Sequence, residues 1–107
     1  MTTAIFEVRG YIYKISVTGH ADFNPGNDPV CAAVSVLATT LAQRANDIEA
    51  MGLGKVRQQV IESGKVLLTV ESQYDAWRHA VSTIITGFEL LEYHYPAHVK
   101  LIRRVGE

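Results

Sequence analysis

Cysteine is nearly absent from this sequence, since its 107 residues include a single one, Cys31. One thiol excludes an intrachain disulfide framework, a CxxC redox pair, a four-cysteine zinc site and a cysteine-ligated iron–sulfur cluster. A lone free thiol is typical of proteins from a reducing compartment. The question that follows is whether this one thiol is structural or reactive.

An excess of charge of either sign is also lacking. Ten Lys and Arg residues stand against eleven Asp and Glu residues, for a formal net charge of −1. Without a broad cationic field, direct nucleic-acid binding is not expected. The N-terminal residues form no basic segment followed by an apolar one, and no window approaches the roughly 18 uninterrupted apolar residues of a membrane span. These absences predict neither a signal peptide nor a membrane helix, and they favour the cytoplasm.

The composition that remains suits a packed core, with 48% apolar and 20% charged residues. The length predicts a single domain over residues 1–107. Alternating side chains predict strands at 3–9, 11–18, 55–62, 65–71 and 98–105, and apolar residues three and four apart predict helices at 29–51 and 73–93. The order ββαββαβ predicts an α+β fold in two layers, with two helices packed on a mainly antiparallel sheet.

Both helices have a start signal and an apolar stripe. Asp28 and Pro29 suit the N-cap and first position of the first helix, and Ser72 with Asp75 resembles a capping box for the second. The predicted buried stripes are Val30, Val34, Leu37, Leu41, Ala45 and Ile48 in the first helix, and Trp77, Ala80, Ile84, Phe88 and Leu91 in the second. A row of small residues beside the first stripe, Cys31, Ser35, Ala38 and Ala42, is expected to face the sheet edge or the preceding loop.

The residues best suited to catalysis flank a polar loop at 19–28. Cys31 lies in the first turn of the predicted helix, where free N–H groups and the helix dipole favour a thiolate. His20 lies eleven residues upstream, at the end of a strand. Cysteine and histidine together suffice for nucleophilic acyl transfer, because the imidazole can take the thiol proton and return one to the leaving amine. The first-turn amides are expected to stabilise the oxyanion.

A structural interpretation of the same residues is also open. A lone cysteine beside Ala32 and Ala33 is more often a small buried hydrophobe than a nucleophile. His20 by itself is an ordinary residue at a strand end. Only their coincidence at a capped helix start favours chemistry over packing.

Two further motifs carry no site. The segment 52–56 lacks the upstream glycine and the following Ser or Thr of a phosphate loop. His94 and His98 are four residues apart, but Pro96 breaks the helix that would bring them to one face. No metal and no cofactor is therefore expected.

The loop and helix start together resemble a known motif. Gly19-His20-Ala21, a polar loop containing Gly26, and then Asp28-x-Val30-Cys31-Ala32-Ala33-Val34-Ser35 are similar to the signature of the ribosomal-processing cysteine protease family, Prp. The resemblance implies a cytoplasmic bacterial endopeptidase with a His–Cys dyad that tends to form homodimers. It also implies a substrate, the N-terminal extension of large-subunit ribosomal protein number twenty-seven, which is removed so that the ribosome can be completed.

The family pattern maps onto four positions. His20 and Cys31 match the dyad, and Asp28 and Ser35 match flanking motif positions, so Asp28 is expected to cap the helix and Ser35 to hydrogen-bond near the site. Two features depart from the family. The loop between His20 and Cys31 is a residue shorter, and Pro29 replaces a branched apolar residue.

The loop between His20 and Cys31 has an expected role in binding, and the protease has one alternative. Residues 21–27 are expected to form one wall of a peptide groove and to order on substrate binding, with Phe23 as the main apolar anchor. The alternative to a protease is a non-catalytic ribosome-associated binding module in which Cys31 is structural.

Overall fold

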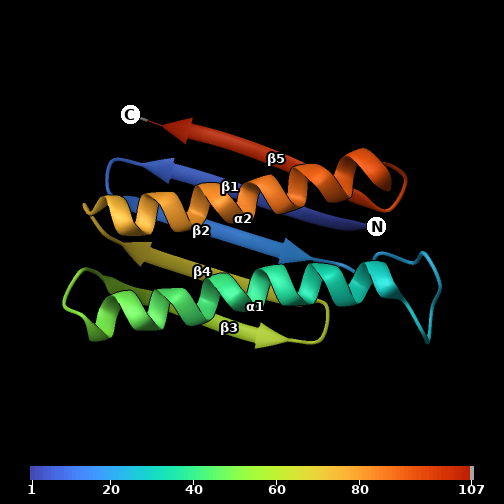
Figure 1. The fold of residues 1–107 in the computed structure, drawn as a ribbon, viewed down its shortest axis with the longest axis horizontal. Helices are drawn as coiled ribbons and strands as arrows, with labels where there is room; N and C mark the ends of the chain where they lie inside the picture. Colours follow the sequence, from blue (N-terminus) through green and yellow to red (C-terminus); the bar gives the residue numbers. More distant parts are fainter. Residues whose placement is uncertain (107) are drawn as a thin grey trace.

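The computed structural model describes residues 1–106, and its elements follow the predicted order ββαββαβ (Figure 1). They are β1 (Thr2–Arg9), β2 (Ile12–Thr18), α1 (Pro29–Ala50), β3 (Lys55–Glu62), β4 (Lys65–Glu71), α2 (Asp75–His94) and β5 (Val99–Gly106). Within this range no helix is long and apolar enough to cross a membrane.

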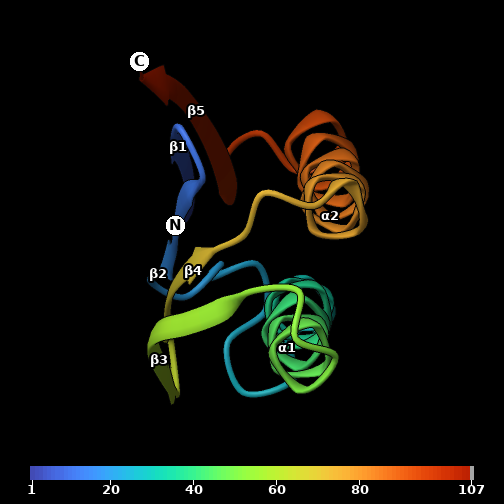
Figure 2. The ribbon, with the colours of Figure 1, turned by 90° about the vertical axis from the view of Figure 1, so that its left-hand side faces the viewer.

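The five strands form one mixed sheet in the order β3-β4-β2-β1-β5. Neighbouring strands are antiparallel except for β1 and β5, which are parallel. The chain reaches β5 through α2, which carries it from β4 past β2 and β1 to the far edge of the sheet. Figure 2 shows both helices side by side on one face of the sheet. The predicted two-layer α+β fold with a mainly antiparallel sheet is therefore confirmed.

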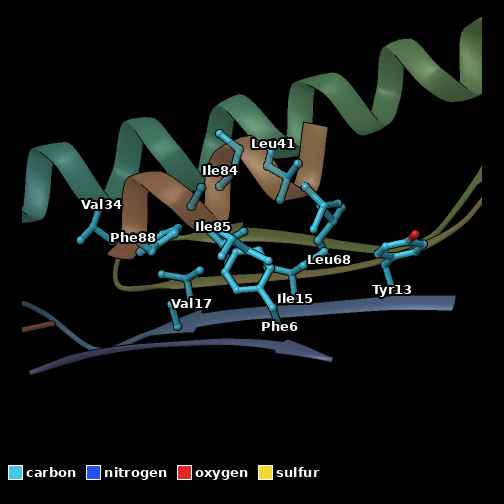
Figure 3. Packing of buried hydrophobic residues seen from close by; sticks show 14 of the residues in the cluster. Phe6, Tyr13, Ile15, Val17, Val34, Leu41, Leu68, Ile84, Ile85 and Phe88 are labelled. Carbon is cyan, nitrogen blue, oxygen red and sulfur yellow. The ribbon is translucent and has the colours of Figure 1, made fainter. Parts of the chain in front are cut away.

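The core lies between the sheet and the two helices (Figure 3). Inward residues alternate along the strands, so that Phe6, Ile15 and Leu68 are buried while their chain neighbours are more exposed. The predicted stripe of α1 is buried except for Leu37, which is half-buried. A Cβ built on Gly87 of α2 would lie 2.7 Å from Leu37 Cδ2. Leu37 therefore packs against the neighbouring helix α2.

The start of α2 differs from its predicted form. The predicted capping box of Ser72 and Asp75 is wrong, because the N-cap is Tyr74 and no side chain caps the helix. The Ser72 hydroxyl instead donates to the Leu53 carbonyl at 2.6 Å and accepts from the Tyr74 N–H at 3.2 Å. Tertiary contact with the loop before β3 thus competes with the local cap.

The buried face of α2 is also broader than predicted. Trp77, Ile84 and Phe88 are buried as expected, whereas Ala80 and Leu91 are half-buried. Val81 and Ile85, which the predicted stripe omitted, are buried as well. The helix packs on both the sheet and α1, so it buries more than one line of residues.

Candidate active site

Six parts of the chain meet at one end of the sheet, at the right of Figure 1. There β2 and β3 end, β1, β4 and β5 begin, and α1 begins. A hollow of about 190 Å³ opens at this end, and its lining includes the predicted residues Gly19, His20, Cys31 and Ser35. The fold therefore brings the candidate histidine and cysteine to the same small hollow. Their separation of eleven residues in the sequence does not by itself require this.

Cys31 is half-buried in the first turn of α1. Its sulfur accepts a hydrogen bond from the backbone N–H of Ala21 at 3.1 Å. An N–H aimed at the sulfur stabilises a thiolate more than a thiol, because hydrogen bonds to charged groups are the stronger ones. This donor, from the residue that follows His20, was not predicted from the sequence.

Asp28 caps α1 as predicted and also holds the preceding loop. Its Oδ1 accepts from the N–H groups of Val30 and Cys31 at 2.9 and 3.1 Å. Its Oδ2 accepts from those of Phe23 and Asn24 at 2.9 and 3.2 Å. Partial desolvation raises the pKa of the Asp28 carboxyl, but these four backbone donors outweigh it and leave the pKa below its usual 3.8. The carboxylate is thus charged at neutral pH and fixes the entry of the chain into the helix.

The same bonds overturn the predicted role of the first-turn amides. The N–H groups of Val30 and Cys31 point to Asp28 Oδ1, and that of Ala32 donates to the Asp28 carbonyl at 3.1 Å. Amides with a carboxylate or carbonyl partner cannot also receive an oxyanion without breaking those bonds. The prediction that these amides form the oxyanion site is therefore wrong.

His20 is exposed and lies against the turn between β3 and β4. A Cβ built on Gly64 of that turn would lie 2.8 Å from His20 Nε2, and the Gly64 carbonyl accepts the Gly19 N–H at 2.9 Å. Gly64 has a φ of +71°, a conformation that suits glycine. The predicted strands 55–62 and 65–71 leave Ser63 and Gly64 as the turn between them, but the contact of Gly64 with His20 was not predicted, because it depends on the pairing of β2 with β4.

The residue before His20 is held by the first strand. Thr2, fully buried, donates its hydroxyl to the Gly19 carbonyl at 3.2 Å. A Cβ on Gly19 would overlap the Met1 carbonyl oxygen, so this position needs glycine for close approach. Thr2 lines the hollow as well, and nothing in its sequence neighbourhood signals this role.

The loop 21–28 is anchored at several points. Phe23 lies edge-on to the rings of Tyr95 and His98, with centroid separations of 5.2 and 5.4 Å. Phe23, the main apolar residue of the loop, therefore has ring partners without a bound peptide, and the ordering of the loop on substrate binding stays a prediction. His98 Nδ1 also lies 2.8 Å from the Ala21 carbonyl oxygen. His98 thus contacts the site although sequence reasoning considered it only as a metal ligand and set it aside.

Two of the predicted supporting residues lie apart from these contacts. Gly26 is exposed in the turn closed by the bond from the Asn27 N–H to the Asn24 carbonyl at 3.1 Å, and it does not line the hollow. Ser35 lines the hollow but is exposed. In the part of the chain from 1 to 106, the Ser35 hydroxyl makes no hydrogen bond to protein, nor does one join His20 to Cys31. Catalytic hydrogen bonds often tighten only once substrate binds.

No group of three or more His, Cys, Asp or Glu side chains within residues 1–106 is arranged to hold a metal ion.

The sequence matches the model of a family described as cysteine protease Prp over residues 1–100. No protein with a curated description matches the sequence.

Solved structures share the fold over nearly the whole chain. The essential ribosomal processing protease Prp from S. aureus, in complex with a covalently linked product peptide, is 21% identical with a TM-score of 0.73, covering 97% of this chain and 100% of that one. The same protease with a substrate peptide is 19% identical, with a TM-score of 0.67 and the same coverage. A Streptococcus mutans protein is 26% identical with a TM-score of 0.69, covering 98% of both chains.

Proposed function

The chain belongs to the family of Prp cysteine proteases, whose model spans all but its last residues, and from this premise we propose a His–Cys endopeptidase that trims a ribosomal protein. As a member of that family it is a hydrolase. In the proposal, Cys31 is the nucleophile and His20 is the general base and acid. The observation that carries these roles is that both side chains border one hollow, where the sulfur already receives an N–H.

The proposed reaction has two halves. His20 takes the Cys31 proton, and the thiolate attacks the scissile carbonyl to form a tetrahedral oxyanion. Collapse forms a thioester and breaks the C–N bond, and the His20 imidazolium gives its proton to the leaving amine. Water, deprotonated by His20, then attacks the thioester and regenerates the thiol. Each proton removed is returned, so the enzyme ends as it began.

Asp28 and Ser35 have supporting roles in this proposal. The Asp28 carboxylate holds both the first turn of α1 and the loop before it, so it fixes the approach of Cys31. Ser35 lies one turn beyond Cys31 on the same hollow, where its free hydroxyl is available to a bound peptide. Gly26 gives the loop wall its turn, and Gly19 admits the close approach of the first strand.

The proposed substrate is the N-terminal extension of large-subunit ribosomal protein number twenty-seven. Support comes from the family motif around His20 and Cys31, and from the S. aureus relative, a ribosomal processing protease crystallised with a substrate peptide. A protease with this substrate would act in the bacterial cytoplasm during ribosome assembly. We include homodimerisation in the proposal, to be checked by light scattering, and expect no direct contact with nucleic acid and no cofactor.

The test is incubation with the uncut N-terminal peptide of that ribosomal protein, followed by mass spectrometry. Cleavage at one internal bond is expected with the wild-type chain and none with Cys31→Ala. A peptide of identical composition and scrambled order controls for unspecific proteolysis. A chain that folds but leaves the authentic peptide intact would contradict the proposed substrate.

A second measurement separates the protease from the non-catalytic binding module. Cys31 is the single cysteine, so the rate of total alkylation reports this thiol alone. A reactive thiol at neutral pH favours the protease. A thiol that is unreactive, or whose alkylation rate rises only near the ordinary cysteine pKa of about 8.5, would favour the binding module. Peptide binding that survives Cys31→Ala unchanged, without any cleavage by the wild type, would favour it too.

A further inference from the structure

Ala21, the first residue of the loop after His20, is held at both of its backbone polar groups. Ala21 is fully buried. Its N–H donates to the Cys31 sulfur at 3.1 Å, and its carbonyl oxygen lies 2.8 Å from His98 Nδ1. One short backbone unit therefore joins the sulfur to a histidine that is 77 positions along the chain from Ala21.

We propose that His98 is a positioning residue for the protease, which holds the Ala21 carbonyl so that the Ala21 N–H stays aimed at the Cys31 sulfur. The inference rests on the proposed role of Cys31 as nucleophile. His98 acts through Ala21 and does not itself touch the reacting atoms.

The bond requires a particular protonation of the His98 ring. A carbonyl oxygen only accepts hydrogen bonds, so Nδ1 must carry the proton. Both the neutral Nδ1–H tautomer and the doubly protonated ring meet this condition, whereas the neutral Nε2–H tautomer does not.

The position of the His98 ring is fixed by several neighbours. The His98 N–H donates to the Tyr95 carbonyl at 2.9 Å, and the His98 carbonyl accepts the Thr2 N–H at 2.9 Å. Phe23 lies edge-on to the ring at a centroid separation of 5.4 Å. The backbone of His98 is thus bound to the turn after α2 and to the start of β1, and its ring is packed from the loop side. Such a side chain can serve as a rigid support.

Removal of the Nδ1–H leaves the carbonyl of a buried residue without its partner. A buried acceptor without a donor is unfavourable, so Ala21 is expected to move towards water. That movement takes the Ala21 N–H away from the sulfur and withdraws support from the thiolate. The rate of the chemical step is therefore expected to fall, because the thiolate is the attacking species.

Two substitutions separate the hydrogen bond from the packing of the ring. His98→Phe keeps an aromatic ring against Phe23 and loses the donor. His98→Asn loses the ring but places an amide N–H near the position of Nδ1. His79→Phe is the matched control, because His79 is an exposed histidine on α2 away from the site.

The readouts are the alkylation rate of Cys31 at neutral pH and kcat for the peptide. His98→Phe is expected to lower both by roughly 3- to 10-fold, the range that one lost hydrogen bond produces, with KM little changed. His98→Asn is expected to stay within about twofold of wild type, as is His79→Phe. Should His98→Phe fail to fold, His98→Gln replaces it, because its amide lies near Nε2 and cannot reach the Ala21 carbonyl.

Wild-type rates in the donor-less variant would overturn the proposal. Equal losses in His98→Phe and His98→Asn would also overturn it, because packing alone would then be responsible. Nitrogen-15 shifts of the wild-type imidazole add a test without mutation: a proton on Nδ1 is expected, and a neutral ring protonated only on Nε2 contradicts it.

The alkylation measurement needs no substrate, so the two proposals can fail separately. A wild-type chain that leaves the ribosomal peptide uncut while the His98 variants alter alkylation as expected refutes the substrate and supports His98. Cleavage that persists in Cys31→Ala refutes the proposed catalytic roles and, with them, the role of His98.

Discussion

The two ends of the sheet each carry a hollow, and the larger one is at the end away from Cys31. That far hollow measures about 1020 Å³ and is lined among others by Tyr11, Lys55 and Tyr74, with no cysteine or histidine in its lining. The hollow beside His20 and Cys31 measures about 190 Å³. The smaller one is lined by both His20 and Cys31, so the proposed site rests on side-chain chemistry and not on the volume of the hollow.

The first turns of the two helices lie at opposite ends of the sheet and differ in how they are capped. The start of α1 is capped by Asp28, which accepts from two first-turn N–H groups and from two N–H groups of the preceding loop. The start of α2 has no side-chain cap, and its first-turn Asp75 pairs with Arg78 at 3.1 Å on the surface. The helix start that carries the cysteine therefore has a side-chain cap, which the start of α2 lacks. Residues that occupy equivalent positions at the two ends supply matched controls.

The largest expected effect comes from the thiol. Cys31→Ala is expected to abolish peptide cleavage, because no other side chain at the site can form the thioester. The fold should persist, since alanine is smaller than cysteine and the position is only half-buried. Tyr11→Ala at the far end should leave kcat/KM unchanged. Measurable cleavage by Cys31→Ala after removal of contaminating protease would refute the nucleophile.

The next effect concerns the base. His20→Ala is expected to lower kcat by about 10²- to 10⁴-fold, the usual contribution of general acid–base catalysis. Since His20 is exposed, the melting temperature should change little. His79→Ala, at another exposed histidine, should retain full activity. A His20→Ala protein with wild-type kcat over the neutral pH range would remove this residue from the mechanism.

Two glycines sharpen the comparison between the ends. Gly64 has a φ of +71° with the His20 ring beside it, and Gly52 has a φ of +74° with nothing within 4 Å of an added Cβ. Alanine at either position should cost about 1–2 kcal/mol, because both take the left-handed backbone conformation. Only Gly64→Ala should also displace His20 and lower kcat, by roughly tenfold. Equal kcat losses in the two variants, measured at equal folded fraction, would argue against the contact.

The smallest expected effect is on stability. Asp28→Ala is expected to lower the melting temperature by about 4–8 °C, the size for loss of one helix cap in a domain of this length. Asp75→Ala, which removes only an exposed first-turn charge and its pairing with Arg78, should lower it less. Scanning calorimetry on both variants checks the order. A larger loss from Asp75→Ala would contradict the difference between the two helix starts.

The stability that the Asp28 cap contributes should depend on pH in acid. Folding lowers the pKa of Asp28 below 3.8, so its charged form adds stability that is fully present above about pH 3.8 and is lost as the pH falls through the lower folded-state value. Asp28→Asn keeps a capping oxygen without this titration. The melting-temperature difference between wild type and Asp28→Asn should therefore narrow below about pH 3.8, and a difference independent of pH would contradict the shifted carboxyl.

Local patterns in the sequence determined the elements of this protein and the two candidate residues. Alternation and three-to-four spacing depend on which side chains need burial, and that need is already present in the chain. The α1 cap was predictable for the same reason, since Asp28 bonds to amides within five residues of itself. The choice of His20 and Cys31 as candidates also followed from local features, a strand end and a capped helix start on either side of one polar loop.

Tertiary structure alone decided what surrounds those two residues. Gly64 reaches His20 because β2 pairs with β4, and Thr2 reaches Gly19 because β1 begins where β2 ends. His98 reaches Ala21 only once α2 has crossed the sheet and β5 lies parallel to β1. These contacts join residues far apart in the chain, so no periodic pattern within one segment could predict them. A capping box at Ser72 failed for the same physical reason, since the Leu53 carbonyl, brought near by the fold, was the better partner for its hydroxyl.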